Sequence, residues 1–196
     1  LASYRMDGDV MDASGTYHGS AAGDATFTDG SGDTPFAYAG NKALQLDGDG
    51  DRVSIADTAS LRPGTKAWTL SLWFKTSNTN QIAALIGKRK PVSPYTQMGL
   101  WMAGTGTGNT GPGQRLHTFV IGTEAARWEV HSSREYADGK WHHVALVRRD
   151  GNWSPVLYID GVATAININH DAGTRPHDVN CTEPWYIGDV GSGSYF

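Results

Sequence analysis

Three carboxylates stand at alternate positions in the stretch Asp47-Gly48-Asp49-Gly50-Asp51, a spacing that offers oxygen ligands to a divalent cation. An EF-hand loop begins in this way, but it needs Gly at its sixth position and Glu at its twelfth. The sequence has Arg52 and Thr58 at those positions instead. Because residues 52–55 also alternate like a strand, a helical calcium loop is excluded. The stretch is interpreted as a polar turn between strands.

A second group of side chains has the chemistry to bind a sugar. Exposed aromatic rings stack on the C–H faces of sugars, while guanidinium, amide and carboxylate groups hydrogen-bond to the hydroxyls. The predicted carbohydrate-binding residues are Arg89, Tyr95, Gln97, Trp101, Arg115 and Trp128. For Trp101 and Trp128 the competing interpretation is packing in the core. Trp73 and Trp141 are assigned to the core.

Catalytic arrangements are harder to find in this sequence. On a strand, a retaining glycan hydrolase would need acidic residues two positions apart, so that they share one face. Glu129 and Glu135 stand alone in their segments. A polysaccharide lyase would need a convergent set of arginine, histidine and tyrosine, for which the candidates are Arg115, His117, His131 and Tyr136. We therefore expect no enzyme, with a lyase as the catalytic alternative.

Strands must position these groups, because the apolar residues alternate with a period of two. In Trp68–Lys75, the side chains of Leu70, Leu72 and Phe74 share one face, which is predicted to be core. Asp160-Gly161 lies between two such runs and predicts a tight hairpin. The other strand-like runs are residues 43–46, 52–55, 81–86, 97–102, 116–122, 128–131, 141–148, 156–159, 162–168 and 185–188.

Composition narrows the class of protein further. A chain of 196 residues fits one β domain spanning 1–196. The net charge of −4 provides no basic patch for nucleic acid, and no apolar run is long enough to span a membrane. Sixteen Asp against four Glu favour turns and oxygen-rich ion sites. Cys181 is the only cysteine, and the start at Leu1 suggests a module excised from a larger protein.

Several segments, in order along the chain, resemble known sequence patterns. Ala43–Val53 is similar to "ALxFDGxxDYV", Trp68–Lys75 to "FTISLWVK", and Trp141–Arg148 with Leu157–Gly161 to "WHHVALV…LYIDG". These patterns are found in laminin-G-like jelly-roll domains of the concanavalin A-like lectin/glucanase superfamily, which has pentraxin-like relatives. The resemblance implies an all-β fold, a two-sheet antiparallel β-sandwich. This fold serves lectins, pentraxin-like binders, adhesion modules and glycan-cleaving enzymes, so the function must be argued from the site residues.

The resemblance also implies calcium, in a structural or a ligand-bridging role. One place for it is the N-terminal segment, with Asp7 or Asp12 as ligands. The other follows the pentraxin-like pattern and uses Asp189, which comes directly after Trp185–Gly188. Metal ligands are therefore predicted at Asp7, Asp12 and Asp189.

Domains of this kind usually continue with a last strand similar to "FxGxIDEVRIY", whereas this chain ends at Phe196. Either the chain is truncated, or another polypeptide supplies the strand, as a second copy in a homo-oligomer or as a different partner. The sequence thus predicts a secreted or cell-surface module that binds a glycan or polysaccharide with calcium. The alternative is a structural or adhesion subunit that self-assembles by strand complementation.

Overall fold

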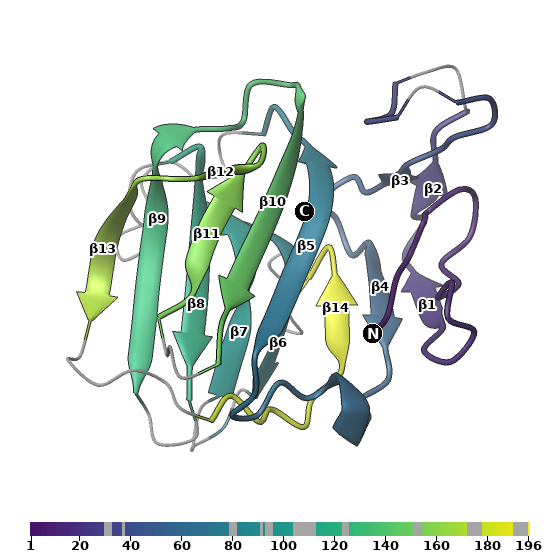
Figure 1. The fold of residues 1–196 in the computed structure, drawn as a ribbon. Helices are drawn as coiled ribbons and strands as arrows, with labels where there is room; N and C mark the ends of the chain where they lie inside the picture. The colour runs from purple at the N-terminus through teal and green to yellow at the C-terminus, as the bar shows by residue number, and fades with distance from the viewer. Residues whose placement is uncertain are drawn as a thin grey trace.

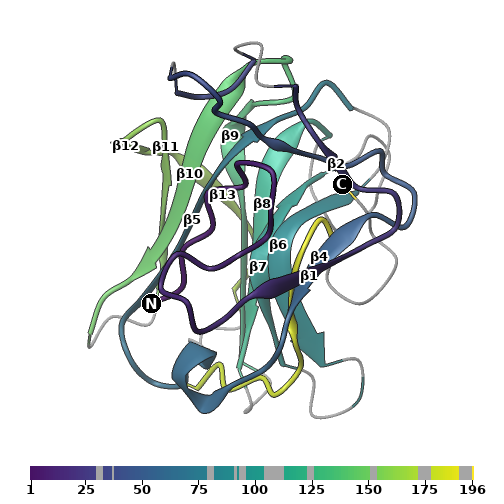
Figure 2. The same ribbon diagram turned by 90° about the vertical axis from the view of Figure 1, so that its right-hand side faces the viewer.

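Two antiparallel sheets pack face to face in the computed structural model (Figure 1). Figure 2, turned by 90°, shows these sheets as two layers. The residues that the structure describes are 1–29, 33–36, 38–78, 82–90, 92, 96–103, 113–122, 126–150, 154–171, 178–189 and 196, and of 167–171 only the backbone. The arrangement confirms the predicted all-β sandwich.

The larger sheet has eight strands in the order β1-β4-β14-β6-β7-β8-β9-β13. Their bounds are β1 Gly19–Ala22, β4 Arg52–Ile55, β14 Trp185–Ile187, β6 Ala83–Lys90, β7 Thr96–Met102, β8 Arg115–Ile121, β9 Arg127–Glu135 and β13 Ile166–Asp171. The chain therefore places β1 and β9 near opposite edges of this sheet.

The smaller sheet has four strands in the order β12-β11-β10-β5. Their bounds are β5 Trp68–Lys75, β10 Trp141–Arg148, β11 Val156–Ile159 and β12 Val162–Ala163. β2 (Thr26–Phe27) pairs separately with β3 (Leu44–Gln45), and a 3-10 turn covers Ala59–Leu61. β10 pairs with β5 along its whole length, from Trp141 opposite Lys75 to Arg148 opposite Trp68.

The core lies between the two sheets and follows the period of two. Leu70, Leu72 and Phe74 of β5 pack into it, as the alternation predicts, and Val144 and Leu146 of β10 join them. The larger sheet contributes mainly β7, β8 and β9, through Met98, Leu100, Leu116, Val120, Trp128 and Val130. The opposite face of β5 therefore points away from the core.

The Asp160-Gly161 hairpin is confirmed between β11 and β12. Both residues have positive φ, 52° and 79°, as the tight turn that suits the twist of two strands requires. The predicted strand over residues 162–168 is wrong in one respect, because the chain leaves the smaller sheet after β12 and enters the larger one as β13. β1 was not predicted, since Gly19–Ala22 carries no bulky apolar side chain.

Candidate functional site

A cluster of three aspartates forms where β1 meets β4. Asp24 follows β1, while Asp47 and Asp51 precede β4. Because the two strands pair antiparallel, the end of β1 lies beside the start of β4. One carboxylate oxygen from each aspartate lies within 4.8 Å of the others. The stretch 47–51 is thus a turn, as predicted, and also part of an acidic cluster.

Asp51 is the residue that makes this cluster a candidate ion site. The residue is only 1% exposed, and its Oδ2 accepts a hydrogen bond from the backbone N–H of Asp47 at 3.2 Å. Its Oδ1 is buried and has no hydrogen-bond partner among the described residues. A buried polar atom without a partner costs about 1–3 kcal/mol, and carboxylate oxygens are preferred ligands of Ca²⁺. The residues present therefore fit a calcium ion.

Sequence reasoning missed this cluster because Asp24 is distant from Asp47 in the chain. The signal that brings them together is the pairing of β1 with β4, which the sequence did not reveal. Gly23 allows the end of β1 to approach Asp51 closely. Its φ is +81°, and a Cβ at this position would collide with Asp51 Oδ1.

Asp12, a predicted calcium ligand, instead ties the N-terminal segment together. Its carboxylate accepts hydrogen bonds from the backbone N–H groups of Ser3 at 2.8 Å, Ser14 at 3.1 Å and Tyr17 at 3.0 Å. The Ser14 hydroxyl donates to it as well. Burial by itself would raise the pKa of Asp12, but these hydrogen bonds outweigh burial and hold the pKa far below its usual range. Both carboxylate oxygens of Asp12 thus accept hydrogen bonds from within the N-terminal segment.

The other two predicted metal ligands also lie outside the acidic cluster. Asp7 accepts a hydrogen bond from the Tyr38 hydroxyl at 2.9 Å and another from the Lys42 backbone at 3.2 Å. Asp189 is buried after β14, and its Oδ2 is 3.9 Å from the guanidinium of Arg52. Asp7, Asp12 and Asp189 thus contact other protein groups and stand apart from the three aspartates of the β1–β4 cluster.

Two of the predicted sugar-stacking rings are buried. Trp101 is 3% exposed and packs against Ala84 and Phe119 on the outer face of the larger sheet. Its ring lies over Gly99, where a Cβ would sit 2.8 Å from the ring. Trp128 is 2% exposed and belongs to the core between the sheets. Exposure of Trp101 and Trp128 was thus predicted wrongly, because close packing on neighbouring strands covers both rings.

The remaining predicted sugar-binding residues that the structure describes do not meet at one place. Arg89 of β6 lies directly opposite Gln97 of β7, and both are half-buried. Arg115 begins β8, where it lies opposite Glu135. Tyr95 lies outside the described residues.

The residues considered as catalytic groups of a lyase do not point into one common site. His117 lies opposite His131 in the β8–β9 pair, on the face of the larger sheet that points away from the core. Burial lowers the pKa of His117 to about 3, and the neighbouring His131 and Arg127 lower it further. Tyr136, in contrast, belongs to the core between the sheets. The arginine, histidines and tyrosine therefore have no common substrate position.

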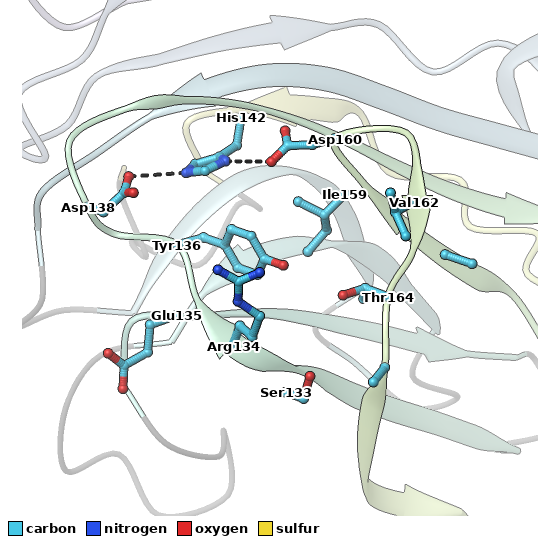
Figure 3. Close-up of a pocket in the computed structure, with 12 residues that line it drawn as sticks. Ser133, Arg134, Glu135, Tyr136, Asp138, His142, Ile159, Asp160, Val162 and Thr164 are labelled. Atoms are coloured by element: carbon cyan, nitrogen blue, oxygen red, sulfur yellow. Dashed lines mark hydrogen bonds and ion pairs between the residues drawn. The ribbon is translucent and has the colours of Figure 1, made fainter.

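A pocket of about 370 Å³ opens between the end of β9 and the β11–β12 hairpin (Figure 3). Buried Tyr136 and Ile159 contribute apolar surface to it. Polar groups surround them, from the side chains of Arg134, Asp138, His142, Asp160 and Thr164, whereas the Glu135 carboxylate points away from the others (Figure 3). The volume lies within the range of about 300–1,000 Å³ that is typical of small-molecule sites. Of these residues, sequence reasoning selected Tyr136 alone, as a candidate for a lyase, and none for carbohydrate binding.

His142 connects the two sides of this pocket. Its Nδ1 is 2.8 Å from Asp160 Oδ2, and its Nε2 is 3.1 Å from Asp138 Oδ1 (Figure 3). The hydrogen bond from His142, with one from the Lys140 backbone, lowers the pKa of Asp138. The Tyr136 ring meets the imidazole nearly at right angles, with centroids 5.1 Å apart. His142 of β10 thus links Asp138 and Asp160, which form the rim of the pocket.

These features define a laminin-G-like β-sandwich with an acidic cluster at one edge and a pocket toward the other. A laminin G family model, described as the concanavalin A-like lectin/glucanases superfamily, matches residues 47–196. The chain therefore belongs to this family. No curated protein has a matching sequence.

Solved structures show the same fold at low sequence identity. The binding domain of Paraclostridial Mosquitocidal Protein 1 is 12% identical with a TM-score of 0.65, over 97% of this chain and 46% of that one. The receptor binding domain of botulinum neurotoxin type G is 14% identical with a TM-score of 0.55, over 94% and 46%. This chain thus spans less than half the length of each structure.

No helix in the part of the chain that the structure describes is long and apolar enough to cross a bilayer.

Replacing Asp12 by asparagine should lower the melting temperature at pH 7, since the carboxylate gathers several N–H donors. A carboxyl group whose native pKa is depressed stabilises the fold above its unfolded pKa, about 3.9, and this contribution is lost as the pH falls through the native pKa. The difference from wild type should therefore be largest near neutral pH and shrink below about pH 4. Thermal denaturation followed by circular dichroism checks this. A pH-independent difference, or an equal effect of Asp9→Asn, would contradict it.

Proposed function

We propose that this chain is a non-catalytic module of an extracellular protein, that it binds carbohydrate in the pocket beside β9, and that it holds calcium at the β1–β4 cluster. The pocket carries the proposal. Its supports are the aromatic ring, the carboxylates and the guanidinium that line it, together with a fold shared with toxin binding domains.

The chemistry of the pocket suits a sugar. A pyranose ring has an apolar C–H face and hydroxyl groups around its edge. A site that binds it therefore needs an apolar surface surrounded by hydrogen-bonding groups. Tyr136 and Ile159 supply the apolar surface. Asp138 and Asp160 accept hydrogen bonds from hydroxyls, and Arg134 donates them. Because both aspartates already lie within hydrogen-bond distance of His142, little side-chain freedom is lost when a ligand binds.

The proposed calcium has a structural role. The cluster lies where β1 and β4 form one edge of the larger sheet, whereas the pocket lies beside β9, near the opposite edge. An ion at Asp24, Asp47 and Asp51 would relieve the buried Asp51 oxygen and join the two strand ends. It would not touch a ligand in the pocket. This favours the structural alternative over a ligand-bridging ion.

A second candidate function is self-assembly through β5. This strand has eight residues and is an edge strand of the smaller sheet. It pairs with β10 along one edge, and no other strand of the described residues pairs with its second edge. An open strand edge can pair with another polypeptide.

Substitutions in the pocket should weaken glycan binding. After a glycan array or polysaccharide pull-down identifies a ligand, Arg134→Ala and Asp138→Ala should each raise its Kd by roughly tenfold or more, the value of one charged hydrogen bond. Isothermal titration calorimetry measures the change. Arg149→Ala is the control, because Arg149 is exposed after β10 and does not line the pocket. Unchanged affinity in both pocket variants would exclude this site.

Calcium should stabilise the fold through Asp51. At a calcium concentration 100 times its Kd, the gain is about 2.7 kcal/mol, or roughly 5–11 °C in melting temperature for a domain of this size. Asp51→Asn should abolish the shift that calcium produces in differential scanning fluorimetry. Asp49→Asn should retain it, since that side chain is outside the cluster. A shift of equal size in Asp51→Asn would place calcium elsewhere.

Light scattering on the purified chain separates the two candidate functions. Assembly through β5 predicts a molar mass that rises with protein concentration, whereas a constant monomer mass contradicts it.

A further inference from the structure

The outer face of the smaller sheet carries exposed aromatic rings. Trp73 of β5 lies on the face opposite to Leu72 and Phe74 and is 39% exposed, although it was assigned to the core. Phe36, from the segment before β3, is 50% exposed. The two rings meet at 74° with centroids 5.3 Å apart, so they form a corner open to solvent. We call Phe36 and Trp73 the aromatic corner.

Hydrogen-bonding groups surround the aromatic corner. The His143 ring lies 5.2 Å from that of Trp73, and its Nε2 is 2.8 Å from the Ser71 hydroxyl. On the other side of Trp73 along β5, the ammonium group of Lys75 pairs with Asp33 at 2.6 Å. An aromatic face bordered by a hydroxyl, an imidazole and an internally neutralised ion pair suits an uncharged ligand with both C–H and O–H groups.

The aromatic corner and the pocket lie at the same end of the smaller sheet. Trp73 is directly opposite His143 in the β5–β10 pair. The backbone N–H of His143 in turn donates to Asp160 Oδ1 at 2.9 Å, and Asp160 lines the pocket. The backbones of Trp73 and Asp160 are thus separated by two strand spacings, roughly 10 Å. The pocket lies on the inner face of this sheet, where Ile159 and His142 point, whereas the aromatic corner lies on the outer face. A ligand that contacts both must therefore pass around the end of the sheet at Asp160.

We infer that the ligand is a neutral oligosaccharide that occupies the pocket with one ring and continues over Asp160 and His143, so that a further ring stacks in the aromatic corner. This rests on the proposed sugar-binding function of the pocket. Neutral sugars are favoured because the carboxylates of Asp138 and Asp160 outnumber the guanidinium of Arg134 and repel uronic acids or sulfates.

The test is the dependence of affinity on chain length. The neutral ligands for calorimetry are glucose, mannose and N-acetylglucosamine, together with their β-1,4-linked oligomers of up to six rings. A series of oligogalacturonates provides the anionic ligands for comparison. For the neutral series that binds, the affinity of the wild type should rise roughly tenfold between one ring and three. Trp73→Ala should remove this gain and leave the Kd of the single sugar unchanged.

Phe36→Ala tests the aromatic corner without altering a strand, and it should reduce the same gain. Thr69→Ala is the matched control, since Thr69 is exposed on the same face of β5 and distant from the corner. Affinity that does not depend on length, tighter binding of the anionic series, or an undiminished gain in both Trp73→Ala and Phe36→Ala would overturn the inference and leave the pocket as proposed. Binding of no saccharide at all would overturn the proposed function as well.

Discussion

The alternation of side chains along β10 is the constraint on which both proposed ligand-contact surfaces depend. Successive residues of a strand point to opposite faces, so His142 and His143 serve different surfaces although they are neighbours. His142 is directed toward Phe74 and Tyr136 and fixes the carboxylates of the pocket rim. His143 faces outward beside Trp73. A shift of one residue in the pairing would exchange these roles and remove both surfaces.

Much of the fold could be predicted from local patterns. The alternation in Trp68–Lys75 identified the buried face of β5, and Asp160-Gly161 identified a hairpin whose two central residues both need positive φ. Such features depend on residues close together in the sequence. They also position the pocket, because the hairpin brings Asp160 within reach of His142.

The candidate site was predicted less well, since it depends on contacts between distant segments. Asp24 joins Asp47 and Asp51 only through the pairing of β1 with β4, and β1 has no apolar pattern. The burial of Trp101 depends on Ala84 and Phe119 of the neighbouring strands and on Gly99, where a Cβ would lie 2.8 Å from the ring. The exposure of Trp73 was within reach of sequence reasoning: once its neighbours on β5 were assigned to the core, alternation required Trp73 to point outward.

A map of backbone amide shifts during titration with a neutral oligosaccharide tests the central claim most directly. Binding in the pocket and the aromatic corner predicts that the largest changes in the NMR spectrum fall on residues 133–138 and 159–165 and on the indole of Trp73. Changes concentrated instead around Arg89 and Gln97, on the outer face of the larger sheet, would contradict it.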